Sequence, residues 1–355
     1  MTGLYIHIPF CMVKCDYCAF YSLKGRGDLM DAYCSALNSQ FRAYKGVCAD
    51  TVFFGGGTPS LLGSSRLSGL LRNIFEVFNV QPLSEISLEA NPESSPDSFL
   101  AEAREAGFNR VSLGVQSFID SELKSAGRVH DASRAIKSVL AARKAGFDDI
   151  NADLIYGLPG QTMETWRESI RTALSLPLTH MSLYALTPEP GTRLYERFRE
   201  ADGDLQADMY LEACALLADA GFIHYEVSNW AKPGFECRHN LKYWRLEEYL
   251  GFGPAAASDF GGRRFTAAAD LESYLRCPVS PPLSEDSSPD GPEREKERLM
   301  LSLRTADGIE TGRFLPYCEE LAERGLGQIR DGRFRLTDAG FLLSNSIIGE
   351  FWDRM

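Results

Sequence analysis

The sequence predicts an α/β fold in which a partial (β/α)6 barrel is followed by a small C-terminal winged-helix-like α+β domain. Residues 4–186 alternate short β-rich segments with amphipathic ones, the pattern of repeated βα units around a parallel sheet. Residues 278–293 are dominated by proline, serine and acidic side chains, as in an exposed linker. A chain of 355 residues suits one large and one smaller domain.

Six segments have the β-branched and aromatic composition of strands: LYIHIP, TVFFGG, EISLEA, RVSLGVQ, DINADLIY and HMSLYAL. Amphipathic helices are expected between them, as in DAYCSALNSQFRAY, SRLSGLLRNIFEVF and ASRAIKSVLAARKAG. Because a closed barrel of this type has eight strands, six units predict a partial one.

The predicted strands carry polar side chains on one face. Residues two apart in a strand share a face, and along 111–116 apolar residues alternate with Ser112, Gly114 and Gln116. The expected inner face includes Tyr5, His7, Glu89, Gln116 and Asp153. A closed barrel is packed mainly with branched apolar side chains, so this face predicts a cavity that holds a polar ligand. The alternative is a set of isolated polar residues, each satisfied by its neighbours.

Four segments are expected along the chain. The barrel takes 1–230, a barrel-associated segment takes 231–277, the linker is 278–293 and the small domain is 294–355. In the small domain, two helical patterns precede a short ribbon and a last helix, EREKERLMLSLRT, TGRFLPYCEELAERG and RFRLTDAGFLLSNSIIGEFW.

The composition excludes some partners. A formal net charge of -12 gives no basic face for a phosphate backbone, so nucleic acid is not an expected partner. Nine cysteines without a framework spacing suit a reducing compartment. The first strand begins at Leu4, and no apolar run reaches membrane-spanning length. We therefore expect a cytoplasmic protein that meets membranes only through its partners.

Cys11, Cys15 and Cys18 directly follow the first predicted strand. A 4Fe-4S cluster is usually held by four thiolates, so a loop with three leaves one iron open to a non-protein ligand. Structural zinc is an alternative, but its sites usually bring two pairs of ligands and no second C-x2-C exists here. Three unliganded core thiols are the other alternative. The spacing favours a 4Fe-4S cluster.

The spacing C-x3-C-x2-C resembles the signature of the radical S-adenosylmethionine (radical SAM) superfamily. In that superfamily the amino and carboxylate groups of S-adenosylmethionine fill the open iron position. GGGTPS, Gly55 to Ser60, resembles the segment that accepts hydrogen bonds from the methionyl ammonium. An ordinary glycine turn is the alternative for this segment. The resemblance implies that S-adenosylmethionine is a cofactor.

The resemblance narrows to the oxygen-independent coproporphyrinogen III oxidase family and its heme chaperone HemW branch. It extends over nearly the whole chain, through YIHIPFC, FFGGGTPS, SLEANPE, RVSLGVQSF, GRVH, NADLIYGLPGQT, YALTPEPGT, HNLKYW and RLTDAG. It implies that Tyr5 and Tyr17 lie beside the nucleoside, that Gly56, Gly57 and Thr58 contact its methionyl part, that Glu89 and Arg128 hold its charged end, and that Gln116 and Asp153 bind the ribose hydroxyls.

Two of these polar residues have open alternatives. Arg128 pairs chemically with a carboxylate, and its alternative is a solvated surface arginine. In the oxidase branch the histidine matching His7 lies near the reacting centre. The alternative for His7 is a structural histidine.

Two features separate the oxidase from the chaperone branch. The oxidase resembles C-x3-C-x2-C-x-C, whereas Phe20 occupies the place of its fourth cysteine here. The oxidase also has a long extension before its first strand, and here ten residues precede Cys11. Both features point away from decarboxylation of coproporphyrinogen, which stays the alternative function.

HNLKYW, residues 239–244, matches the HNxxYW pattern of the heme chaperone branch. His239 could ligate heme iron, and Tyr243 and Trp244 could pack on the macrocycle. Cys237 is a second candidate ligand, and Ala257 stands where relatives commonly have a histidine. The alternative is that the motif only anchors its segment to the barrel. We expect a heme chaperone that passes heme to apo-hemoproteins, such as those of the respiratory chain.

Overall fold

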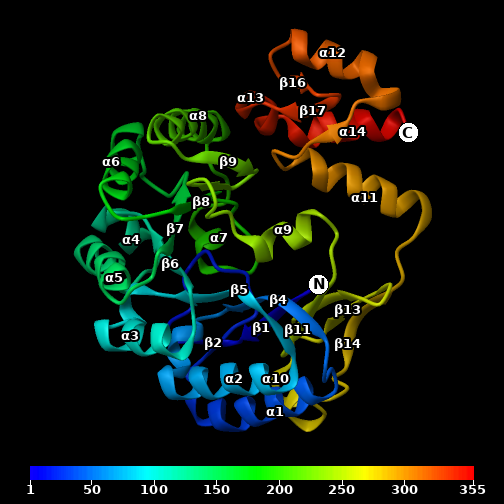
Figure 1. Cartoon of the computed structure of the whole chain (residues 1–355). Coiled ribbons are helices and arrows are strands. Elements are labelled where there is room, and N and C mark those ends of the chain that lie inside the picture. Colours follow the sequence, from blue (N-terminus) through cyan, green and yellow to red (C-terminus); the bar gives the residue numbers. More distant parts are fainter.

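The computed structural model describes residues 1–355, and its main feature is a curved parallel sheet covered by helices on its outer side (Figure 1). Its six central strands are parallel and adjacent in chain order: β1 (Thr2–Ile8), β4 (Cys48–Gly56), β5 (Asn79–Ala90), β6 (Arg110–Gln116), β7 (Asp149–Tyr156) and β8 (His180–Ala185). These strands confirm the predicted partial barrel.

The connecting helices follow the strands in order: α1 (Met30–Arg42), α2 (Ser64–Val77), α3 (Asp97–Ala106), α4 (Asp120–Ser125), α5 (Ala132–Lys144), α6 (Met163–Leu174), α7 (Arg193–Arg197) and α8 (Gly203–Asp219). The apolar residues of the strands form the core beneath them, and Val111, Leu113 and Val115 have no exposed surface. Their burial leaves the alternate residues of each strand to face the inside of the barrel.

The sheet continues beyond both ends of the barrel. β11 (Tyr249–Phe252) pairs in parallel with β1, and β12 (Ala257–Phe260) and β13 (Arg263–Ala267) extend it further. At the other end, β10 (Asn229–Ala231) and β9 (Ile223–Glu226) add antiparallel strands. The result is an open sheet of 12 strands, so its two ends do not meet as they would in a closed barrel.

The segment predicted to be an exposed linker contains a strand. β14 (Leu283–Ser287) pairs with β13, and Arg263 holds Asp286 with two hydrogen bonds of 2.7 Å. Every residue of β14 is exposed. Its polar composition is that of a charged edge strand, which discourages further pairing. The segment boundaries at 230, 277 and 293 otherwise stay a prediction.

The C-terminal elements form a separate cluster at one end of the molecule (Figure 1). In order they are α11 (Gly291–Leu303), β15 (Ile309–Glu310), α12 (Leu315–Glu323), β16 (Gly327–Arg330), β17 (Arg333–Leu336), α13 (Asp338–Leu342) and α14 (Ser344–Asp353). Phe334 and Phe351 are fully buried in it. The element order agrees with the expected one, and the winged-helix likeness stays a prediction.

No helix of the chain combines the length and the apolar character needed to cross a bilayer.

Candidate functional site

A cavity of about 640 Å³ lies inside the barrel, and most of the predicted site residues line it. Its walls come from inward-facing residues of β1 and of β4 to β8, from the GGGTPS turn and from the loop that follows β1. The predicted residues on it are Tyr5, Cys11, Cys15, Tyr17, Cys18, Gly56, Gly57, Thr58, Glu89, Gln116, Arg128, Asp153, His239 and Tyr243. The prediction of a cavity with a polar inner face is therefore confirmed.

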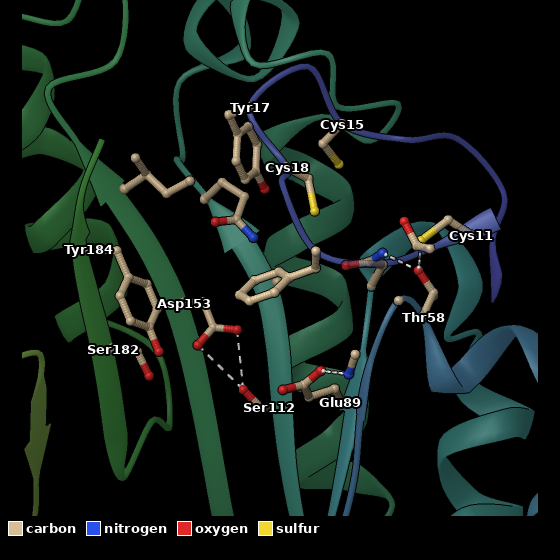
Figure 2. A pocket seen from close by; sticks show the side chains of 18 of the residues that line it. Cys11, Cys15, Tyr17, Cys18, Thr58, Glu89, Ser112, Asp153, Ser182 and Tyr184 are labelled. Atoms are coloured by element: carbon tan, nitrogen blue, oxygen red, sulfur yellow. Dashed lines mark hydrogen bonds between the residues drawn. The ribbon is translucent and has the colours of Figure 1, made fainter. Parts of the chain in front are cut away.

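Three thiols gather at one side of the cavity, and two carboxylates lie at another (Figure 2). Cys11 ends the short strand β2 (Phe10–Cys11), and Cys15 and Cys18 follow in the loop. The Thr58 hydroxyl donates to Cys11 Sγ over 3.5 Å, and Arg128 Nη1 donates to Cys15 Sγ over 3.2 Å. Such hydrogen bonds orient side chains that bind metal.

The arrangement of the thiols fits a cluster better than a single ion. Only one group of three His, Cys, Asp or Glu side chains has its ligand atoms all within 4.8 Å of one another, and it lies elsewhere in the chain. The three thiols are therefore spread more widely than that. Ligands of one zinc ion sit about 2.0 to 2.3 Å from it and so crowd together, whereas the thiolates of a cubane each bind a different iron. Wider separation of Cys11, Cys15 and Cys18 is therefore what a 4Fe-4S cluster requires.

GGGTPS packs its backbone directly against the strand that carries the first cysteine. Gly57 N–H donates to the carbonyl of Ile8 over 2.8 Å, and a Cβ at Gly57 would lie 2.8 Å from the carbonyl oxygens of Ile8 and Phe10. Gly56 has φ 109°, a left-handed conformation that favours glycine. The close approach, rather than the turn alone, explains these two glycines.

Two acidic side chains give the opposite part of the cavity its character. Glu89 accepts the N–H of Gly56 over 3.0 Å, and burial together with the nearby Asp153 raises its pKa to about 8. Asp153 accepts Asn151 Nδ2 over 2.8 Å and the Ser112 hydroxyl over 3.2 Å, and burial raises its pKa. A cationic group bound here would restore the ionised form of these carboxyls.

Arg128 is buried and bonded, so it is not the solvated surface arginine of the alternative. Its side chain is 4% exposed, and Nη2 donates to Asn91 Oδ1 over 2.8 Å and to the Gly114 carbonyl over 2.7 Å. With Nη1 on Cys15, this guanidinium connects the cysteine loop to the end of β6. It places a fixed positive charge beside the thiols.

Gln116 reaches the cavity through a distortion of its strand. The pairing of β6 with β7 shifts register between Gly114 and Gln116, and Gln116 has φ 70°. A bulge of this kind redirects a side chain at the end of a strand, and a strained non-glycine backbone is typical of binding sites. The sequence alternation gave the correct face for Gln116 but no sign of the bulge.

His7 does not line the cavity, although it shares a strand face with Tyr5. Its Nδ1 lies 3.1 Å from the Tyr5 hydroxyl and its Nε2 lies 3.0 Å from the Tyr21 carbonyl. Burial lowers the pKa of His7 to about 4, so the ring is neutral. These bonds fit the structural alternative, and a catalytic role of His7 stays a prediction.

The HNLKYW motif forms the short helix α9 (Arg238–Trp244) beneath the barrel. His239 Nδ1 lies 2.8 Å from the Thr51 hydroxyl, and Nε2 lies 2.8 Å from the Tyr243 hydroxyl. The ring also stacks on Phe53 at 5.1 Å, and burial lowers its pKa to about 3. Both ring nitrogens are engaged, as expected if the motif anchors α9.

The other candidate heme contacts lie away from the cavity. Trp244 does not line it, and Cys237 is fully buried with its thiol 3.5 Å from Glu85 Oε1. Ala257 is the first residue of β12. Of the three residues named for heme, only His239 and Tyr243 thus border the cavity, and their heme role stays a prediction.

The sequence reading missed several polar cavity residues: Asn91, Ser112, Asn151, Ser182 and Tyr184. Three of them had a signal, because Asn91, Ser112 and Asn151 share strand parity with Glu89, Gln116 and Asp153, which were already placed inside. Asn91 donates to the Thr58 hydroxyl over 3.1 Å and accepts a hydrogen bond from Arg128. It joins the glycine turn to the arginine.

Comparison with known proteins gives a consistent family. Residues 5–173 match the family model of the radical SAM superfamily. The chain is 36% identical to the heme chaperone HemW of Lactococcus lactis over 368 residues, covering 99% of this chain and 97% of that protein. It is also 36% identical to the heme chaperone HemW of Bacillus subtilis, covering 99% of each.

The fold has a solved counterpart as well. Coproporphyrinogen III oxidase (HemN) from Escherichia coli, a radical SAM enzyme, superposes with a TM-score of 0.85 and 24% sequence identity. The match covers 100% of this chain and 90% of that one. At this identity the likeness concerns the fold.

Proposed function

Because the chain belongs to the radical SAM superfamily, and within it to the HemW family of heme chaperones, we propose that it binds heme and transfers it to apo-hemoproteins. The observation that carries the proposal is the 36% identity to HemW proteins over 99% of the chain. The cavity supports it, because its thiols, glycine turn and acidic residues suit a cluster and a cationic nucleoside.

We propose that Cys11, Cys15 and Cys18 hold a 4Fe-4S cluster and that the cavity beside them binds S-adenosylmethionine. When bound, the cluster supplies an iron with an open coordination position. Arg128 would pair with the nucleoside carboxylate, and Glu89 would neutralise a positive group. Asp153 would accept hydrogen bonds from the ribose hydroxyls, and the Gln116 amide would donate hydrogen bonds to them or accept from them.

The rival function is oxidative decarboxylation of coproporphyrinogen III; the E. coli protein with the similar fold is a coproporphyrinogen III oxidase. At the position of the fourth cysteine of the oxidase pattern, this chain has Phe20, which is 71% exposed at the cavity rim. Phenylalanine can neither bind metal nor exchange a proton. This difference favours the chaperone.

Heme contact through HNLKYW remains part of the proposal, with one condition set by the geometry. His239 can ligate iron only if one ring nitrogen leaves its partner, either Nδ1 the Thr51 hydroxyl or Nε2 the Tyr243 hydroxyl, each 2.8 Å away. Tyr243 lines the cavity, so its movement would expose the imidazole on that side.

We also propose a cytoplasmic location, since nine free thiols and a low-potential cluster persist in a reducing compartment.

The test is to supply anaerobically reconstituted protein separately with heme and with coproporphyrinogen, S-adenosylmethionine and a reductant. We expect a Soret band that moves to an added apo-hemoprotein, and no protoporphyrinogen. Protoporphyrinogen formation would replace the chaperone proposal by the oxidase, and the absence of heme binding would contradict the chaperone proposal directly.

A further inference from the structure

A second group of ligand-type side chains lies away from the cavity, between the barrel and the C-terminal elements. Cys214 belongs to α8, His224 to β9 and Asp338 to α13. One ligand atom from each lies within 4.8 Å of the other two. None of the three lines the cavity described above.

The group contains polar atoms that lack partners. His224 Nδ1 lies 2.8 Å from Asp338 Oδ1, but His224 Nε2 is buried without a hydrogen bond. The Tyr210 hydroxyl, on a side chain 3% exposed, is also unpartnered and lies near Cys214 and Asp338. Buried polar atoms without partners are uncommon in native proteins and indicate a missing ligand or ion.

The surrounding side chains hold the imidazole in place. His224 stacks on Trp230 with ring centroids 4.1 Å apart and planes 10° apart, and Phe341 lies 4.7 Å away. Cys214 is 3% exposed, which closes it to a substrate and argues against a nucleophilic thiol. The Asp338 side chain is 47% exposed, so the group opens to solvent on that side.

We propose that Cys214, His224 and Asp338 bind a zinc ion, with the Tyr210 hydroxyl or a water molecule as the fourth ligand. Thiolate, imidazole and carboxylate are the three ligand types that zinc takes in proteins. A thiolate disfavours magnesium and calcium, which prefer oxygen ligands only. Ligands about 2.0 to 2.3 Å from one ion lie at most about 4.6 Å apart, so the observed spacing needs little adjustment.

The ion would add a link between the barrel and the C-terminal elements, because its three ligands come from both parts. The two parts already meet through backbone hydrogen bonds, such as Ala306 N–H to the Tyr225 carbonyl over 2.9 Å, through the contact of Phe341 with His224, and through the ion pair of Arg245 with Asp307 at 2.8 Å. A zinc ion held by α8, β9 and α13 would therefore act as a clamp on the C-terminal elements. Binding to the folded state alone would raise thermal stability.

The decisive experiment measures zinc in the cluster-containing, full-length protein. After equilibrium dialysis against zinc chloride, elemental analysis should find one zinc per chain, and zinc-edge X-ray absorption should find one sulfur at about 2.3 Å with nitrogen and oxygen at about 2.0 to 2.2 Å. Absence of bound zinc overturns the proposal. So does a three-sulfur shell, which would place zinc on Cys11, Cys15 and Cys18.

Variants localise the ion. Cys214→Ala and Asp338→Asn should each weaken zinc binding at least tenfold, and Cys318→Ala, another buried thiol, should leave it unchanged. Because Asp338 is about half exposed, its amide variant should fold even if Cys214→Ala does not. Unchanged affinity in Asp338→Asn would contradict the proposed ligand set.

Discussion

At the residue scale, the cavity combines a positive charge beside the thiols with two carboxyls that share a low-dielectric space. Burial and the neighbouring Asp153 raise the pKa of Glu89 to about 8, so at neutral pH this side chain is largely protonated in the ligand-free protein. Its Oε2 nevertheless accepts the N–H of Gly56. Glu89 is therefore poised to ionise when a positive group arrives.

S-adenosylmethionine binding should be pH-dependent through Glu89. A cationic ligand favours the ionised carboxyl, so binding releases a proton below pH 8 and affinity should rise with pH, by up to about tenfold per unit, until it levels near pH 8. Anaerobic calorimetry in buffers of different ionisation enthalpy measures both the affinity and the proton. Glu89→Gln should flatten the profile, whereas the exposed Glu105→Gln should not.

The raised pKa of Glu89 also determines the direction in which the stability of the ligand-free protein changes with pH. A carboxyl that holds its proton in the folded state stabilises that state fully below its unfolded pKa near 4.5, and this contribution is lost as pH rises through about 8. An affinity for S-adenosylmethionine that does not change between pH 6 and 8 would contradict the role of Glu89.

The three cysteines should be individually essential for the cluster. Replacing Cys11, Cys15 or Cys18 with alanine should remove most of the thiolate-to-iron absorption, because two protein thiolates are too few for a cubane. Cys48→Ala is the matched control, since Cys48 is an exposed thiol at the start of β4. Equal iron and sulfide in all four variants would reject the assignment.

At the element scale, α9 packs against β4 and is anchored on β5. Its contacts are specific: His239 reaches Thr51 of β4, and the N–H groups of Arg238 and His239 donate to Glu85 of β5 over 2.7 and 3.1 Å. A carboxylate that accepts two N–H groups at a helix start is a strong anchor. In this structure the HNLKYW motif therefore anchors α9, and a contact with heme would be an additional role.

Two variants separate anchoring from heme ligation. His239→Ala and Thr51→Val should both lower thermal stability, by about 1 to 3 kcal/mol, because each leaves a buried polar partner unpaired. If His239 ligates iron, only His239→Ala should also shift the Soret band and loosen heme. Thermal unfolding and heme titration of the two variants side by side give the answer, and identical heme spectra would remove His239 from the proposed heme site.

At the scale of the whole molecule, the sheet of 12 strands joins parts of the chain that the sequence pattern separated. β11 lies inside the sheet between β1 and β12, whereas β14 lies at its edge with every side chain exposed. Strands inside a sheet have both edges paired, and their amides open only with much of the structure.

Hydrogen exchange should reveal this order. The amides of β11 should be protected nearly as well as those of β1 and β4, and those of β14 should exchange orders of magnitude faster. Mass spectrometry of peptides covering 249–252 and 283–287 measures both rates in one experiment. Exchange of β11 as fast as that of β14 would show that 231–277 is not integral to the barrel.

The sequence by itself determined the six central strands and most of the cavity wall. Strand parity is a local property, because a side chain two residues along faces the same side. It therefore placed Glu89, Gln116 and Asp153 on one face, and the spacing of Cys11, Cys15 and Cys18 marked the loop beside them.

Other features of the protein depend on contacts between residues that are distant in the sequence, and only the tertiary structure decided them. The position of His7 outside the cavity lining depends on a carbonyl 14 residues away, and the engagement of Nδ1 of His239 depends on Thr51, 188 residues away. β14 became a strand because β13 offered an edge, and the Cys214, His224 and Asp338 group exists because α13 folds back onto β9. No local pattern encodes such meetings, since each depends on packing between elements that are distant in the sequence.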